Sequence, residues 1–188
     1  MHAFLLSFGV IFVAELGDKS QLMALAFAAR YRPWPVLVGI TIATAIVHAA
    51  SVALGSVIGA QLPTRAITIV AGIAFLGFAA WTLRGDTLGD DEVARAQRAR
   101  SAVVAASVAF FLAELGDKTM LATITLATTE GALGTWAGST LGMVAADALA
   151  ILAGQQLGAR LSARIVRIGA SASFVIFGIL LLVEGTGG

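Results

Sequence analysis

The chain has 188 residues, of which 59% are hydrophobic and 12% are charged, and its net charge is +1. Soluble globular domains carry about 25% charged residues, so the composition argues against a soluble protein. The small net charge gives no reason to expect a nucleic acid as a partner. The absence of cysteine excludes disulfides, thiolate metal sites and cysteine nucleophiles.

Six apolar segments follow one another along the chain, and each is close to the roughly 20 residues that a membrane-spanning helix needs. They cover residues 4–28, 36–60, 66–84, 102–127, 134–158 and 165–184. No lysine or arginine precedes the first segment, and charged residues interrupt it, so we interpret it as a retained helix rather than a cleaved signal peptide. The predicted fold is an all-α membrane protein with six transmembrane helices.

The second half of the chain repeats the first half at a constant offset of 99 residues. Gly39 aligns with Gly138 and Phe75 with Phe174, without gaps. We predict three parts, listed by residue range: a first three-helix repeat over 1–84, a cytoplasmic linker over 85–101 and a second three-helix repeat over 102–188. Because three is an odd number, the two repeats would enter the membrane from opposite sides, as in many secondary transporters.

The positive charges predict an orientation in the membrane. With six spans, one face of the protein carries Arg30, Arg32, Arg84, Arg95, Arg98, Arg100, Arg160, Arg164 and Arg167. Only Arg65 falls on the opposite face. The arginine-rich face should be cytoplasmic, which places both termini outside.

A charged motif interrupts the first and the fourth apolar segments at equivalent positions. Residues 14–20 read Ala-Glu-Leu-Gly-Asp-Lys-Ser, and residues 113–119 read Ala-Glu-Leu-Gly-Asp-Lys-Thr. A charged side chain at the centre of a membrane helix costs about 2.5–3.5 kcal/mol on insertion scales. We therefore expect the motifs to face a buried polar site rather than lipid.

The acids of the two motifs are candidate ligands for a cation. On a continuous helix, a spacing of three residues places both acids of a motif on one face. Inverted symmetry would bring Glu15, Asp18, Glu114 and Asp117 together near the bilayer centre, where four oxygen donors suit Ca²⁺, Mn²⁺ or Mg²⁺. The glycine between the acids could also break the helix and free backbone carbonyls as ligands.

Other polar side chains of the motifs have auxiliary roles in this hypothesis. Ser20, Thr119 and Gln21 offer neutral oxygens. Lys19 and Lys118 would hold the acids ionised and limit their repulsion in the empty site. A structural alternative is a pair of buried Glu–Lys bridges that lock the two halves together.

Two further ionisable residues, His48 and Asp147, are related by the same offset and lie near the middle of their segments. They are candidates for carrying a counter-transported proton, although a lone buried histidine is equally well explained as an inert core residue. Met23, Met120 and Met143 lie near the motifs. A thioether could favour Mn²⁺ over Ca²⁺, but core packing is the preferred interpretation of these methionines.

Small residues recur every four positions in the second and fifth segments. The rows consist of Gly55 and Gly59, of Gly134, Gly138 and Gly142, and of Gly154 and Gly158. Such rows let helix backbones approach closely. We expect them to pack within one chain, and a homodimer seam is the alternative.

Both motifs match the signature E-x-G-D-[KR]-[ST], and through them nearly the whole chain resembles the six-helix cation/proton exchangers. That family includes the Golgi calcium/manganese transporter and bacterial manganese exporters. The resemblance implies export of Mn²⁺ or Ca²⁺ from the cytoplasm in exchange for protons, with Glu15, Asp18, Glu114 and Asp117 as cation ligands. Eukaryotic members carry longer leaders and central loops, so the resemblance implies a bacterial cytoplasmic (inner) membrane protein.

Two other classes of function fit the sequence less well. An exporter of a basic amino acid or another organic cation would need a larger, aromatic-lined cavity, yet Trp34, Trp81 and Trp136 are all expected at the membrane interfaces. A membrane metal-dependent enzyme would need a nucleophile or a histidine cluster, and the chain has only His2 and His48. We therefore predict a transporter without a cofactor, with the metal ion and protons as substrates.

Overall fold

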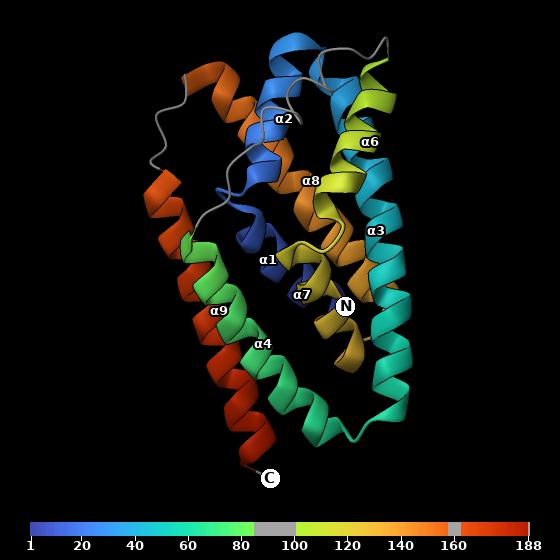
Figure 1. Ribbon diagram of the computed structural model, residues 1–188, viewed down its shortest axis with the longest axis vertical. Coiled ribbons are helices and arrows are strands. Elements are labelled where there is room, and N and C mark those ends of the chain that lie inside the picture. Colours follow the sequence, from blue (N-terminus) through green and yellow to red (C-terminus); the bar gives the residue numbers. More distant parts are fainter. Residues whose placement is uncertain (85–100, 158–162, 188) are drawn as a thin grey trace.

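The computed structural model describes residues 1–84, 101–157 and 163–187, and these residues form eight α-helices (Figure 1). The helices are α1 (His2–Glu15), α2 (Lys19–Arg30), α3 (Pro33–Gln61), α4 (Thr64–Arg84), α6 (Ala102–Glu114), α7 (Lys118–Thr129), α8 (Ala132–Leu157) and α9 (Ala163–Thr186). The predicted all-α class is confirmed. The predicted linker, apart from its last residue, lies outside the described residues.

Four of the described helices contain stretches that are long and apolar enough to cross a membrane. These stretches are Pro33–Gln61, Thr64–Arg84, Ala132–Ala153 and Ile168–Thr186. They correspond to four of the six predicted segments. The other two predicted segments, 4–28 and 102–127, are each divided into two helices, of which α1 and α6 are apolar but only 14 and 13 residues long.

The charged motifs form the breaks in these two segments. Gly17 has a φ of +75° and Gly116 a φ of +80°, values that glycine adopts at little cost and other residues rarely adopt. The residues on either side of each glycine are extended, and helix resumes at Lys19 and at Lys118. The prediction that glycine breaks the helix is confirmed, and the prediction of one continuous helix face for both acids of a motif is wrong.

The two broken segments run antiparallel, with their breaks side by side. His2 Nδ1 lies 3.2 Å from Glu130 Oε2 at one end, and the rings of Phe27 and Phe110 lie 6.4 Å apart toward the other end. Between these contacts, an ion pair joins Lys118 to Asp18. Residue numbers therefore fall along one segment as they rise along the other.

The main packing contacts join the first half of the chain to the second. Helix α1 packs on α8, α6 packs on α3, and α4 packs on α9. A Cβ on Gly138 would lie 2.3 Å from the carbonyl oxygen of Phe4, and one on Gly39 would lie 2.6 Å from that of Val103. Glycine at these positions lets the α8 and α3 backbones touch those of α1 and α6.

The glycine rows pack inside the chain, as expected. Gly55 and Gly59 lie against backbone carbonyls of α7, while Gly134 and Gly142 lie against α1. The surroundings of Gly154 are not described, and Gly158 lies outside the described residues.

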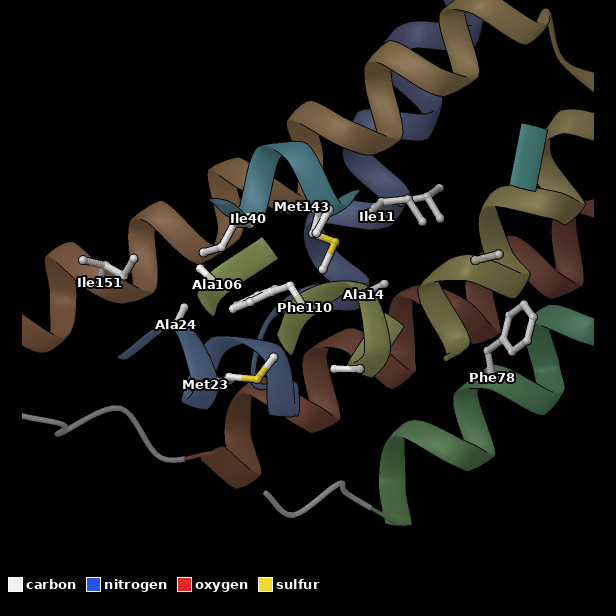
Figure 2. Packing of buried hydrophobic residues seen from close by; sticks show 14 of the residues in the cluster. Ile11, Ala14, Met23, Ala24, Ile40, Phe78, Ala106, Phe110, Met143 and Ile151 are labelled. Carbon is white, nitrogen blue, oxygen red and sulfur yellow. The ribbon is translucent and has the colours of Figure 1, made fainter. Parts of the chain in front are cut away.

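Buried apolar side chains surround the breaks. Figure 2 shows Met23, Phe110 and Met143, from α2, α6 and α8, in one buried cluster. Met23 is 3% exposed and Met143 is fully buried, which agrees with core packing for these two methionines. Elsewhere, Phe75 and Phe78 of α4 pack against Phe174 of α9 with ring centroids 5.8–5.9 Å apart.

The α4–α9 pair covers one end of the broken segments and not the other. Its further contacts are between α4 and α7 and between α9 and α1, whereas in the described part of the chain it makes few contacts with α2 or α6. Because the start of α1 lies beside the end of α7, both contacts fall at the same end. Figure 1 shows the α4–α9 pair at the lower left, with α2 and α6 at the top.

Candidate functional site

All four acids of the motifs are buried at the helix breaks. Glu15 and Glu114 are the last residues of α1 and α6 and are fully buried. Asp18 and Asp117 precede α2 and α7 as N-cap residues, and each is 3% exposed. The positive end of a helix dipole stabilises a carboxylate at this position.

Each lysine of the motifs pairs with the aspartate of the opposite half. Lys118 forms an ion pair with Asp18, and both side chains are 2% exposed. Lys19 Nζ lies 3.5 Å from Asp117 Oδ1, and the Lys19 side chain is 21% exposed. The alternative of buried Glu–Lys bridges is therefore wrong, because the described lysines bridge the halves through aspartates.

The two glutamates differ in their hydrogen bonds. Thr119 Oγ1 donates a hydrogen bond of 2.7 Å to Glu114 Oε2. At the equivalent place in the first half, Ser20 Oγ and both carboxylate oxygens of Glu15 are buried and have no hydrogen-bond partner among the described residues. Buried acceptors are normally satisfied, so these oxygens require an explanation.

Gln21 links the first break to α8. The N–H of Gly17 donates to Gln21 Oε1 at 2.8 Å, and Gln21 Nε2 donates to the carbonyl oxygen of Ala146 at 3.0 Å. At the second break, the N–H of Gly116 donates to the sulfur of Met120 at 3.2 Å. From the sequence, Gln21 was expected only to offer a neutral oxygen. Its bridge to α8 was missed, although an amide four residues after the glycine was a signal for it.

His48 and Asp147 are fully buried on α3 and α8, and their polar side-chain atoms have no hydrogen-bond partner within the described ranges. The charge of Asp147 interacts with those of Glu15, Asp18 and Glu114. The two positions, equivalent in sequence, are equally buried, and Asp147 shares its electrostatic environment with the acids of the motifs.

The acids form one electrostatic cluster but not a closed cage. Glu15 interacts with the charges of Glu114, Asp18 and Asp147, and Glu114 interacts with those of Asp117 and Asp18. Across residues 1–84, 101–157 and 163–187, no three His, Asp or Glu side chains lie close enough to hold a metal ion. In this arrangement the aspartates are engaged by lysines instead.

Comparisons with known proteins identify the family. The family described as "Divalent cation/proton antiporter GDT1" matches residues 3–90 and 102–188. A Vibrio cholerae protein named "Putative manganese exporter" is 37% identical over 158 residues, which are 82% of this chain and 78% of that protein. A GDT1-like protein of Synechocystis is 32% identical over 200 residues, with 96% of each chain covered. A chloroplastic GDT1-like protein of Oryza sativa is 30% identical over 206 residues, which are 94% of this chain and 59% of that protein.

No solved structure matches the chain. The family match extends over both halves, including both charged motifs. Its members are transporters, so the alternatives of an enzyme and of an organic-cation exporter are set aside. The chain belongs to the GDT1 family of divalent cation/proton antiporters and is not an enzyme.

Proposed function

We propose that the protein exports Mn²⁺ from the cytoplasm in exchange for protons, with Ca²⁺ as a second substrate. The observation that carries this proposal is the set of buried carboxylate oxygens without hydrogen-bond partners in the described residues, on Glu15, Glu114, Asp117 and Asp147. Hard oxygen donors of this kind suit Mn²⁺ and Ca²⁺. The relative named as a manganese exporter favours Mn²⁺.

The proposed membrane arrangement has six spans in two inverted repeats. Helices α1 and α2 together form the first span, and α6 and α7 form the fourth. The antiparallel course of these segments supports this arrangement, because an inverted repeat requires it. Burial of the acids at both breaks also supports it, since polar groups at membrane depth need protein or water around them.

The arginine distribution sets the proposed location. Arg30, Arg32 and Arg84 lie at the end of the protein where α2 ends, α3 begins and α4 ends. We assign this end to the cytoplasm of a bacterium, across its inner membrane, with both termini outside.

Cation binding in this proposal displaces the lysines. Glu15, Asp18, Glu114 and Asp117 are the ligands, with the hydroxyls of Ser20 and Thr119 beside them. Before the metal binds, the ammonium groups of Lys118 and Lys19 pair with the carboxylates of Asp18 and Asp117. An aspartate released by its lysine moves to the metal, and the lysine takes the aspartate back after the metal leaves.

Protons compete with the metal for the same carboxylates. A carboxylate ligand must be deprotonated to bind a metal, so proton binding from outside releases the cation. Of the two other candidates for proton transfer, Asp147 lies within electrostatic reach of the acids. Asp147 therefore fits the role better.

The position of the α4–α9 pair supports an alternating-access mechanism. Its contacts with α1 and α7 close one end of the broken segments, and the end at α2 and α6 is left without these contacts. We assign this arrangement to the state that is open to the cytoplasm. In the opposite state, the equivalent contacts at the offset of 99 residues join α4 to α6 and α9 to α2.

The test is transport into inside-out membrane vesicles with an acidic interior. We expect Mn²⁺ uptake that depends on the pH gradient, with Ca²⁺ measured in parallel. The double variant Glu15→Gln/Glu114→Gln should lose uptake, because it removes two ligand charges. Ser171→Ala, which removes a buried hydroxyl that donates to the Ala79 carbonyl between α9 and α4, serves as the control and should retain uptake.

Two results would contradict the proposal. Full-rate uptake by the double glutamine variant would remove the glutamates from the site. Uptake that ignores the pH gradient would leave a uniporter or channel in place of an exchanger.

A further inference from the structure

We propose that Asp147 binds the transported cation together with Glu15 and Asp18, so that the two helix breaks contribute unequally to the site. This inference rests on the proposed function and refines it. Asp147 lies outside both charged motifs, on a different helix from either break. Its equivalent in the first half, His48, takes no part in cation binding.

The position of α8 at the α1–α2 break supports this role of Asp147. Gln21 accepts a hydrogen bond from the N–H of Gly17 and donates one to the carbonyl oxygen of Ala146, the residue before Asp147. Through this bridge, α8 is held against the α1–α2 break at the residue that precedes the acid. Within this arrangement the charge of Asp147 acts on those of Glu15 and Asp18, and also on that of Glu114.

Asp147 is a fully buried acid whose carboxylate oxygens both lack hydrogen-bond partners in the part of the chain that the structure describes, which supports a role in cation binding. A buried carboxylate without partners is costly. A cation at the α1–α2 break would supply the missing interaction for Asp147 and for the equally unpartnered Glu15.

The two halves differ in the side chain that follows each break, and this difference also supports the role of Asp147. At the second break the residue equivalent to Gln21 is Met120, whose side chain has no N–H and cannot donate to a carbonyl of α3. His48 therefore lacks the bridge that positions Asp147.

The inference has an electrostatic consequence. Glu15, Asp18 and Asp147 with Lys118 give the first break a formal charge of −2 when ionised, from three carboxylates and one ammonium. Glu114 and Asp117 with Lys19 give the second break −1, from two carboxylates and one ammonium. The divalent ion should bind more tightly at the first break, which matches its charge.

The experiment is calorimetric titration of Mn²⁺ into the purified full-length protein in lipid nanodiscs at constant neutral pH. We expect Asp147→Asn to raise the Kd by about ten- to a hundredfold, as removal of a metal-site partner commonly does. The increase in Kd caused by His48→Asn should be at least fivefold smaller. Ser139→Ala, which removes another buried side-chain polar group from α8, is the matched control and should keep the wild-type Kd.

A second variant tests the positioning of Asp147 without changing any charge. Gln21→Met gives the first break the residue that the second break already has, and it should raise the Kd in the same direction as Asp147→Asn. Met120→Gln is its mirror control and should not. If Asp147→Asn fails to fold, this pair of variants decides the question alone.

The outcomes separate the two proposals. A wild-type protein that binds neither Mn²⁺ nor Ca²⁺ would overturn the proposed function and this inference with it. If the wild type binds Mn²⁺ and folded Asp147→Asn keeps the wild-type Kd, only the role of Asp147 is overturned. If Asp147→Asn does not fold, an unchanged Kd in Gln21→Met has the same meaning.

Discussion

Lys19 and Lys118 occupy the same position in two nearly identical motifs, yet their environments differ. The Lys118 side chain is 2% exposed and pairs with an equally buried Asp18. The Lys19 side chain is 21% exposed, with Asp117 Oδ1 at 3.5 Å. Removing one partner of a buried ion pair leaves an uncompensated charge, which is far more costly than the loss of a partly exposed pair.

This difference predicts unequal effects on stability. Lys118→Met should lower the free energy of unfolding by about 3–5 kcal/mol, because it removes the buried ammonium that pairs with the Asp18 carboxylate. Lys19→Met should lower it by about 1 kcal/mol or less. Reversible unfolding of the purified proteins in one detergent would measure both values.

The control for this prediction removes both partners. The double variant Asp18→Asn/Lys118→Met should regain most of the lost stability, since it removes both charges of this pair, while losing Mn²⁺ uptake. Equal destabilisation by the two single lysine variants would contradict the difference in burial.

Sequence reasoning found the residues of the candidate site but not their pairing. The repeated motif indicated which acids and lysines lie near one another. It did not indicate which lysine pairs with which acid, because the spacing of four residues between glutamate and lysine defines a contact only on an unbroken helix. The break after Glu15 changes the geometry, and Lys118 reaches Asp18 across the two halves instead.

At the scale of helices, glycine controls how closely the two halves approach. The position of a Cβ on Gly138 lies 2.3 Å from the Phe4 carbonyl oxygen, a backbone atom that cannot rotate away. Helices α1 and α8 must therefore separate to admit any side chain there. Gly77 has no atom within 4 Å of the corresponding position, so a methyl group is accommodated freely.

We therefore predict that Gly138→Ala destabilises the protein by about 1–3 kcal/mol through overpacking. Gly77→Ala, the control, should be neutral or slightly stabilising, since alanine favours helix over glycine by about 1 kcal/mol. Thermal unfolding of both variants under identical conditions is the measurement. A Gly138→Ala variant as stable as Gly77→Ala would show that the α1–α8 contact is looser than described.

The helices themselves were largely predictable. Long apolar runs gave the positions of α3 and α4 to within a few residues, because hydrophobic composition decides membrane-length helices. The division of residues 4–28 was less evident, since apolar residues continue on both sides of Gly17. The position of the glycine between two acids indicated a break, but only backbone geometry establishes one.

At the scale of the whole molecule, the repeats share some contacts and differ in others. The packing of α1 on α8 is matched by that of α6 on α3, whereas the contacts of α4 with α7 and of α9 with α1 are not matched to the same extent. The α4–α9 pair rests on α1 and α7, and its few contacts with α2 and α6 leave the other end of the broken segments less covered among the described residues. The sequence could not predict this choice, because the offset of 99 residues makes both ends equivalent. In our proposal the open end faces the cytoplasm.

The chain has no cysteine, so a single introduced cysteine can report which side of the membrane the open end faces. A water-soluble thiol reagent should modify Lys19→Cys at least tenfold faster from the cytoplasmic side, in inside-out vesicles, than from the outer side. Mn²⁺ should slow the reaction. Ser51→Cys, at a fully buried position on α3, should stay unmodified. Faster modification from the outer side would reverse the assigned state.

The exchange of packing partners between the repeats also bears on assembly. Helix α1 has its main contacts with α8, α3 with α6, and α4 with α9, so each half loses most of its contacts between helices when alone. A gene divided between codons 84 and 101 should then yield two polypeptides that accumulate only when both are synthesised. In that form the protein would be an obligate heterodimer, with a continuous chain needed only to keep the two subunits equal in number.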